Sequence, residues 1–136
     1  GNFCLLLGVH PDAVDAWYLG IYCDAIQWVE ITNTRGMSQY ADGGIVATKP
    51  YVASANYIHG MSNYCDKCHY DKKDRLGEKA CPFNALYWEF YIRHADKLAK
   101  NPRIGMAYRQ IEKMSSTAQA EILKKAAWIR ENIEAL

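Results

Sequence analysis

The sequence predicts an all-α fold. Apolar residues recur at helical spacing in several segments, and no segment shows the apolar–polar alternation of a half-buried strand. Half of the 136 residues are apolar, so the chain can bury one sizeable core and is globular rather than disordered. We therefore expect a single helical domain over 1–136, with helices and a loop in 1–63, a cysteine loop and aromatic helices in 64–114, and a packing helix in 115–136.

The first part is expected to contain a long helix followed by a loop. Pro11 and Asp12 favour a helix start, because proline suits the first turn and an acidic residue there complements the helix dipole. Apolar side chains then cover most of the circumference, which predicts a helix from Pro11 to about Trp28 that is buried or lines a cofactor pocket. Residues 31–50 are polar and glycine-rich and predict irregular structure, with a short helical turn at 37–40.

Four more helical segments are predicted. One covers 51–61, and an aromatic-rich helix runs from Pro82 to about Ala99, since proline is tolerated in a first helical turn. A further helix follows Asn101-Pro102 and continues to Met114. Ser116 and Gln119 have the spacing of a capping box for the last helix, where apolar residues again fall at helical intervals.

Three cysteines form the most distinctive pattern in the chain. Cys65 and Cys68 make a CxxC pair that presents two thiolates on one tight turn, and Cys81 follows after twelve residues. The intervening loop is polar and contains Gly77, so it can fold back and bring the third thiolate over the first two. Thiolates prefer soft metals, so the pattern favours an iron–sulfur cluster.

Two other readings of the cysteines stay open on spacing alone. One is a structural zinc site completed by His69 or His59, and the other is a set of free or redox-active thiols. Cys4 and Cys23 are the in-chain candidates for a missing fourth cluster ligand, but lone cysteines in apolar helices are more often ordinary core residues.

Composition limits the compartment and the class of partner. Five cysteines, an odd number, and no signal peptide favour a reducing compartment, so we expect a cytoplasmic protein. No apolar run reaches membrane-spanning length. The net charge is +1, but residues 66–103 hold nine basic and six acidic residues, a local excess of +3. Such a patch fits a DNA-facing surface and also an ordinary solvated one.

Two carboxylates and a glycine pair are candidate ligand contacts. Asp24 and Glu30 lie in or beside apolar segments, where a buried acid needs a partner or a ligand; the alternative is an acid at a helix end facing water. Gly43 and Gly44 allow the backbone to pass close to a ligand, and equally fit a plain loop.

Several motifs, taken in order, resemble one protein family. They are DAWYLGIY, QWVE, NTRGMSQYADGG, KPY, MSNYC-x-x-C and ACPFNALYWEF. They are similar to the iron–sulfur bacterial cryptochrome and photolyase family, prokaryotic (6-4) photolyases that carry FAD and a four-iron four-sulfur cluster. The resemblance implies the C-terminal part of the helical FAD-binding domain, so that the antenna domain and upstream helices of the same polypeptide would be partners of this piece. Residues 1–63 would then form the flavin pocket.

The resemblance also implies roles for cofactor-binding residues. Cys65, Cys68 and Cys81 match three of the four cluster ligands, and the remaining ligand lies upstream in that family. Asp24 matches the aspartate facing the N3/O4 edge of the flavin. Glu30 matches the acid near flavin N5.

Further residues match positions for electron transfer and for the DNA substrate. Trp17 and Tyr18 match the aromatic pair through which electrons reach the photoexcited flavin. Tyr51 and Tyr57 resemble residues on the rim of the lesion pocket. Gly60 stands where the family usually has a basic residue, which removes one expected phosphate contact.

The implied activity is light-driven repair of (6-4) pyrimidine photoproducts by electron transfer from reduced FAD to a flipped-out lesion in damaged DNA. The cluster is then expected to be structural, with a redox role open. Two alternatives are a cryptochrome-type blue-light sensor without repair activity, and a primase-like cluster module that binds nucleic acid without a flavin.

Overall fold

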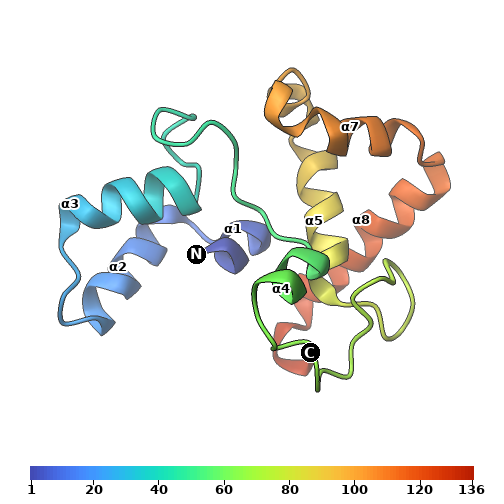
Figure 1. The fold of residues 1–136 in the computed structure, drawn as a ribbon, viewed down its shortest axis with the longest axis horizontal. Coiled ribbons are helices and arrows are strands. Elements are labelled where there is room, and N and C mark those ends of the chain that lie inside the picture. Colours follow the sequence, from blue (N-terminus) through green and yellow to red (C-terminus); the bar gives the residue numbers. More distant parts are fainter. The chain divides into compact units, whose positions relative to one another are not determined.

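The computed structural model describes residues 1–136 and confirms an all-α protein without a β-sheet. The chain divides into two compact units, Gly1–Val52 and Ala53–Leu136, which are described separately; the single-domain organisation stays a prediction. None of the helices combines the length and apolar character that a membrane crossing requires. Figure 1 shows the elements, which are α1 (Asn2–Leu7), α2 (Pro11–Ile21), α3 (Gln27–Glu30), the π-helix η1 (Ile31–Ser38), α4 (Ala55–Met61), α5 (Pro82–Arg93), α6 (Ala95–Leu98), η2 (Pro102–Ile104), α7 (Gly105–Glu112), α8 (Ser116–Glu131) and η3 (Ile133–Ala135).

Helix α2 begins as predicted but ends earlier. His10 caps its N-terminus, since the His10 Nδ1 atom accepts a hydrogen bond from the Asp12 backbone N–H at 3.2 Å. The predicted end at Trp28 is wrong: the helix stops at Ile21, Tyr22 is extended, and a turn at Asp24 leads into α3. Aspartate favours turns because its side chain competes for nearby backbone groups, which explains the break.

The segment 31–50 is less irregular than expected, because residues 31–38 form a π-helix. The Gln39 N–H donates to the Thr34 carbonyl at 2.7 Å, five residues back, which is the π-helical pattern. Gly36 lies in this helix, and a Cβ atom there would sit 3.0 Å from both the Asp42 carboxylate and the Val46 side chain. The following loop therefore packs directly on the helix backbone.

In the second unit, α5 is the central helix and α8 packs along it (Figure 1). The side chains buried between these helices and their neighbours are Leu86, Phe90, Tyr91, Ile122, Ala126 and Ile129. The predicted aromatic helix to Ala99 is divided into α5 and α6 at His94. The predicted helix after Asn101-Pro102 is a 3-10 turn followed by α7.

The cap of α8 differs from the predicted capping box by one residue. Ser115, not Ser116, is the N-cap, and its Oγ accepts from the Ala118 N–H at 3.2 Å. The Gln119 amide instead donates to the Ile111 and Met114 carbonyls at the end of α7. Ser115 therefore takes the capping role that the spacing assigned to Ser116.

Candidate functional site

The three cysteines of the predicted cluster site lie on two segments of the second unit. The Cys68 N–H donates to the Cys65 carbonyl at 3.3 Å, so the CxxC pair forms a tight turn. Cys81 is the N-cap residue of α5. The Cys81 N–H donates to the Asp71 carbonyl at 3.0 Å, and the Asp71 N–H donates to the Lys79 carbonyl at 2.6 Å. The loop therefore folds back on itself immediately before α5.

The Cys65 and Cys68 thiols influence the pKa of Cys81. Burial raises the pKa of Cys81, the nearby Cys68 and Cys65 thiols raise it further, and the Phe83 backbone N–H opposes the shift. All five cysteines are free thiols. No three His, Cys, Asp or Glu side chains lie close enough together to hold a metal ion as they stand. The donor atoms thus have the chemistry of a soft-metal site, while the sulfurs are not in ligating positions.

The two histidines considered as zinc ligands have different surroundings. The Nδ1 atom of His59, on α4, is buried and has no hydrogen-bond partner. The His69 side chain is exposed, with its ring 3.9 Å from the ring of Tyr70. Neither histidine is grouped with the thiols at metal-binding distance, so the zinc alternative stays a prediction.

Asn84, on α5, holds the cysteine loop and was not singled out by the sequence. Its Nδ2 donates to the Lys72 carbonyl at 2.9 Å and to the Asp74 carbonyl at 2.8 Å, and its Oδ1 accepts from the Ala55 N–H at 3.0 Å. The side chain is buried. A polar residue inside the apolar run of α5 was the available signal, since buried amides need partners.

A cavity of about 400 Å³ lies in the first unit between α2, α3 and the π-helix. Glu30 lines this cavity and is only 9% exposed. Its Oε2 accepts a short hydrogen bond from the Thr34 hydroxyl. The other lining residues are Asp12, Asp15, Ala16, Leu19, Gln27, Ile31 and Arg35.

Arg35 is the only cation in the lining and pairs with two acids. Its Nε donates to Asp15 Oδ2 at 2.8 Å, and its Nη2 contacts the carboxylates of both Asp12 and Asp15. The hydrogen bond and charge of Arg35 hold the pKa of Asp12 below its usual range. The second oxygen of Asp15, Oδ1, is buried without a partner. The cavity lining therefore includes Glu30 and an aspartate with one unsatisfied oxygen.

Three aromatic rings lie together on one side of α2. The Trp17 and Tyr18 centroids are 5.2 Å apart, the Tyr18 and Tyr22 rings are stacked at 5.5 Å, and Trp17 lies 6.1 Å from Tyr22. Burial raises the pKa of Tyr18, with smaller contributions that include the charge of Glu30. Tyr22 was missed, although its i+4 spacing from Tyr18 would have indicated the contact.

Of the predicted site residues, only Glu30 lines the cavity of the first unit. Asp24 is exposed in the turn between α2 and α3, as in the alternative of a solvent-facing acid. Gly43 and Gly44 have positive φ angles of 75° and 93°, and a Cβ on Gly44 would sit 2.6 Å from the Tyr40 hydroxyl.

The two tyrosines assigned to the lesion pocket are both exposed. The exposed fractions are 47% for Tyr51, in the first unit, and 58% for Tyr57, on α4 in the second. The functional roles of all these residues stay predictions.

Two known proteins are similar to the chain. A (6-4) photolyase of Agrobacterium fabrum is 54% identical over 127 residues, which are 93% of this chain and 25% of that protein. The chain therefore spans a quarter of the length of this relative. An uncharacterised protein of Acanthamoeba polyphaga mimivirus is 33% identical over 134 residues, 97% of this chain and 97% of the viral protein. No protein-family model matches the chain.

Proposed function

Since this chain belongs to the photolyase family, we propose that it takes part in light-driven repair of (6-4) pyrimidine photoproducts in DNA, with FAD as the cofactor. The observation that carries the proposal is the group of aromatic rings Trp17, Tyr18 and Tyr22 in the same unit as the buried, cavity-lining acid Glu30. Rings 5–6 Å apart on a helix suit short electron hops, and a buried acid suits a polar atom of a bound cofactor.

The first unit fits a flat aromatic cofactor. Large apolar side chains are exposed along α2, the following turn, α3 and the start of the π-helix. Exposed apolar side chains in such number mark a surface that binds a ligand or another part of a protein. They are Trp17 (53% exposed), Leu19, Ile21, Tyr22, Ile26, Trp28 and Ile31. FAD, when bound, supplies light absorption and the transferred electron.

The polar residues of this unit would orient the flavin. Glu30, held by the Thr34 hydroxyl, would accept a hydrogen bond from a ring N–H or share a proton with N5. Asp24 would meet the N3/O4 edge. Gly43 and Gly44 would let the backbone approach the cofactor closely, because they lack a Cβ.

The proposed substrate is damaged DNA. A lesion inside the base stack is too far from a buried flavin, so it has to be flipped out. Tyr51 and Tyr57, both exposed, would contact the flipped nucleotide through their rings.

The second unit would hold an iron–sulfur cluster through Cys65, Cys68 and Cys81. The cluster supplies coordination that fastens the CxxC turn to the start of α5, and coordination energy of this kind becomes folding energy. Three thiolates leave one coordination position for a ligand from elsewhere, which we propose is the upstream part of the same polypeptide.

The test is repair by the full-length protein purified without oxygen. Oligonucleotides with one (6-4) photoproduct are incubated under blue light or in the dark, and restored thymines are counted. We expect light-dependent repair, a flavin absorption band and bound iron. Glu30→Gln should lower repair more than flavin content, while Glu112→Gln, an exposed acid on α7, should change neither.

Each negative result points to a different conclusion. Bound flavin without repair would indicate a light sensor, and bound iron without flavin would indicate a nucleic-acid-binding cluster module. If wild-type protein incubated with excess FAD retains no flavin after the unbound FAD is removed, the proposed cofactor is rejected.

A further inference from the structure

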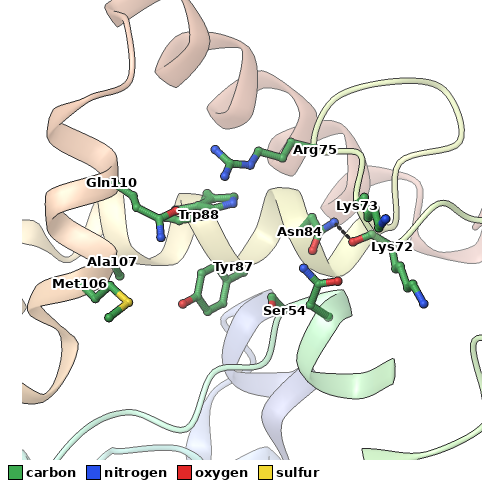
Figure 2. A pocket seen from close by; sticks show the side chains of 11 residues that line it. Ser54, Lys72, Lys73, Arg75, Asn84, Tyr87, Trp88, Met106, Ala107 and Gln110 are labelled. Atoms are coloured by element: carbon green, nitrogen blue, oxygen red, sulfur yellow. Dashed lines mark hydrogen bonds between the residues drawn. The ribbon is translucent and has the colours of Figure 1, made fainter. Parts of the chain in front are cut away.

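A second cavity, of about 300 Å³, lies in the second unit and belongs to none of the predicted sites. It is bordered by the cysteine loop, α4, α5 and α7 (Figure 2). The loop contributes Lys72, Lys73 and Arg75 to the lining, and no acidic residue lines it. The volume lies at the lower end of the range for small-molecule sites.

The three cations are not neutralised by carboxylates. Every ion pair of the protein involves other basic residues. Two acids of the same loop bind its backbone: Asp74 accepts from the Leu76 and Gly77 N–H groups at 3.1 and 3.2 Å, and Asp71 accepts from the Lys73 N–H at 2.7 Å. No carboxylate pairs with these three cations, and the only charged side chains in the lining are positive.

The guanidinium of Arg75 lies over an aromatic ring. Its guanidinium carbon lies 4.7 Å from the centroid of the Trp88 ring, and Figure 2 shows the guanidinium beside that ring. Stacking fixes the plane of a guanidinium but leaves its in-plane N–H groups free, and these match two oxygens of a phosphate. Trp88 itself is only 8% exposed, so the indole is a fixed support.

The loop backbone that carries the cations is also fixed. Asn84, buried on α5, binds the carbonyls of Lys72 and Asp74. The lysine and arginine positions are thereby tied to the most buried helix of the unit. Uncharged hydrogen-bonding groups also line the cavity, from Ser54, Asn56, Tyr87 and Gln110, together with the apolar side chains of Met106 and Ala107.

We propose that this cavity binds a phosphate monoester, such as the terminal phosphate of a nucleotide. Three cations with no lining acid suit a dianionic monoester better than a phosphodiester, which carries one charge. The small concave site suits a terminal group rather than a continuous strand. A free mononucleotide and the 5′-phosphate end of a DNA strand present the same group, and the experiment separates them.

The experiment is calorimetric titration of the full-length protein with thymidine 5′-monophosphate, with thymidine as the control ligand. The monophosphate is expected to bind, more weakly as salt rises, and thymidine is not. Arg75→Ala should weaken binding about tenfold, and Arg75→Lys should recover little of it because lysine lacks the planar fork. Lys124→Gln, which removes an exposed cation on α8 outside the cavity, should leave binding unchanged.

Short oligonucleotides with a 5′-phosphate or a 5′-hydroxyl form the second arm. Tighter binding of the phosphorylated strand alone identifies a strand end as the ligand, whereas binding of the free monophosphate identifies a nucleotide; either result supports the site. Equal binding of thymidine and its monophosphate overturns the proposal. So does wild-type affinity in Arg75→Ala, or an absence of any phosphate-dependent binding in both arms. None of these outcomes depends on flavin or on repair.

Discussion

The carboxylate of Glu89 on α5 is bound to the guanidinium of Arg130 on α8, with 2.5 Å between Oε2 and Nη2. The other oxygen accepts from Arg93 Nε at 2.8 Å, and the Glu89 side chain is only 6% exposed. This pair joins the two helices that form most of the core of the second unit. An acid so deeply placed is tolerated because both of its oxygens are paired.

Arg130→Met is expected to destabilise the second unit by about 2 kcal/mol, since it removes one of two partners from a buried carboxylate. The measurement is urea unfolding followed by circular dichroism. Arg93→Ala is the matched comparison: its partner is the same acid, but the guanidinium is 42% exposed and lies on the same helix. That change should cost only about 0.5 kcal/mol. Equal costs for the two arginines would contradict this account.

Asn84→Ala should cost roughly 2–3 kcal/mol, because it leaves the buried Ala55 N–H without an acceptor and releases two loop carbonyls. Asn84→Asp keeps the acceptor for Ala55 but loses the two donated bonds, so it should also be destabilising. Asn56→Ala, at an exposed position on α4, serves as the control with a cost within about 0.5 kcal/mol. Hydrogen exchange at the Lys73 and Leu76 N–H groups, which are bonded within the loop, should accelerate in both Asn84 variants, and unchanged exchange would show that the amide does not hold the loop.

His94 should make the protein less stable in mild acid. Burial lowers its pKa from the usual 6.5, with a further contribution from the charge of Arg93. The unfolded chain therefore takes up a proton at a higher pH than the folded one. Stability from this group is complete above pH 6.5 and is lost as the pH falls from there through the lower pKa of the folded state. The measurement is the unfolding free energy above and below this pH window. The difference between the two values should be smaller in His94→Gln than in the wild-type protein.

Trp17→Phe should slow photoreduction of bound flavin about tenfold, which corresponds to roughly 1.4 kcal/mol in the barrier. Transient absorption after a blue-light pulse measures the rate. Tyr57 lies on α4, outside the aromatic group of Trp17, Tyr18 and Tyr22. In Tyr57→Phe the flavin should therefore be reduced at the wild-type rate. A wild-type rate in Trp17→Phe would remove this residue from the electron path.

The sequence was most informative where local signals and packing agree. Pro82 at the start of α5 and the apolar spacing of α8 predicted helices that the structure contains. The predicted end of α2 was wrong because apolar residues continue past Ile21, so that the apolar pattern does not show the turn at Asp24. The π-helix was not predictable locally, since the loop side chains of Asp42 and Val46 pack against it at Gly36.

Long-range partners account for what the site analysis missed. The amide of Asn84 accepts a hydrogen bond from Ala55, 29 positions away, and no local sequence pattern predicts such a pair. The spacing of Cys65, Cys68 and Cys81 correctly suggested a loop that folds back, but the three sulfurs are not grouped at metal-binding distance. Glu30 and Asp24 looked alike in sequence, yet one is buried and the other is exposed.

The π-helix at Ile31–Ser38 determines how Glu30 and Arg35 come to line one cavity in the first unit. Glu30 and Arg35 both face the same cavity although they are five residues apart. In an α-helix, positions five apart point about 140° away from each other, whereas one wide turn of five residues aligns them. Loss of a single residue between them would restore a narrow turn with a four-residue spacing, which also aligns the pair. We therefore expect that deletion of one residue from this stretch would leave both side chains on the side of the cavity, whereas a longer insertion would separate them.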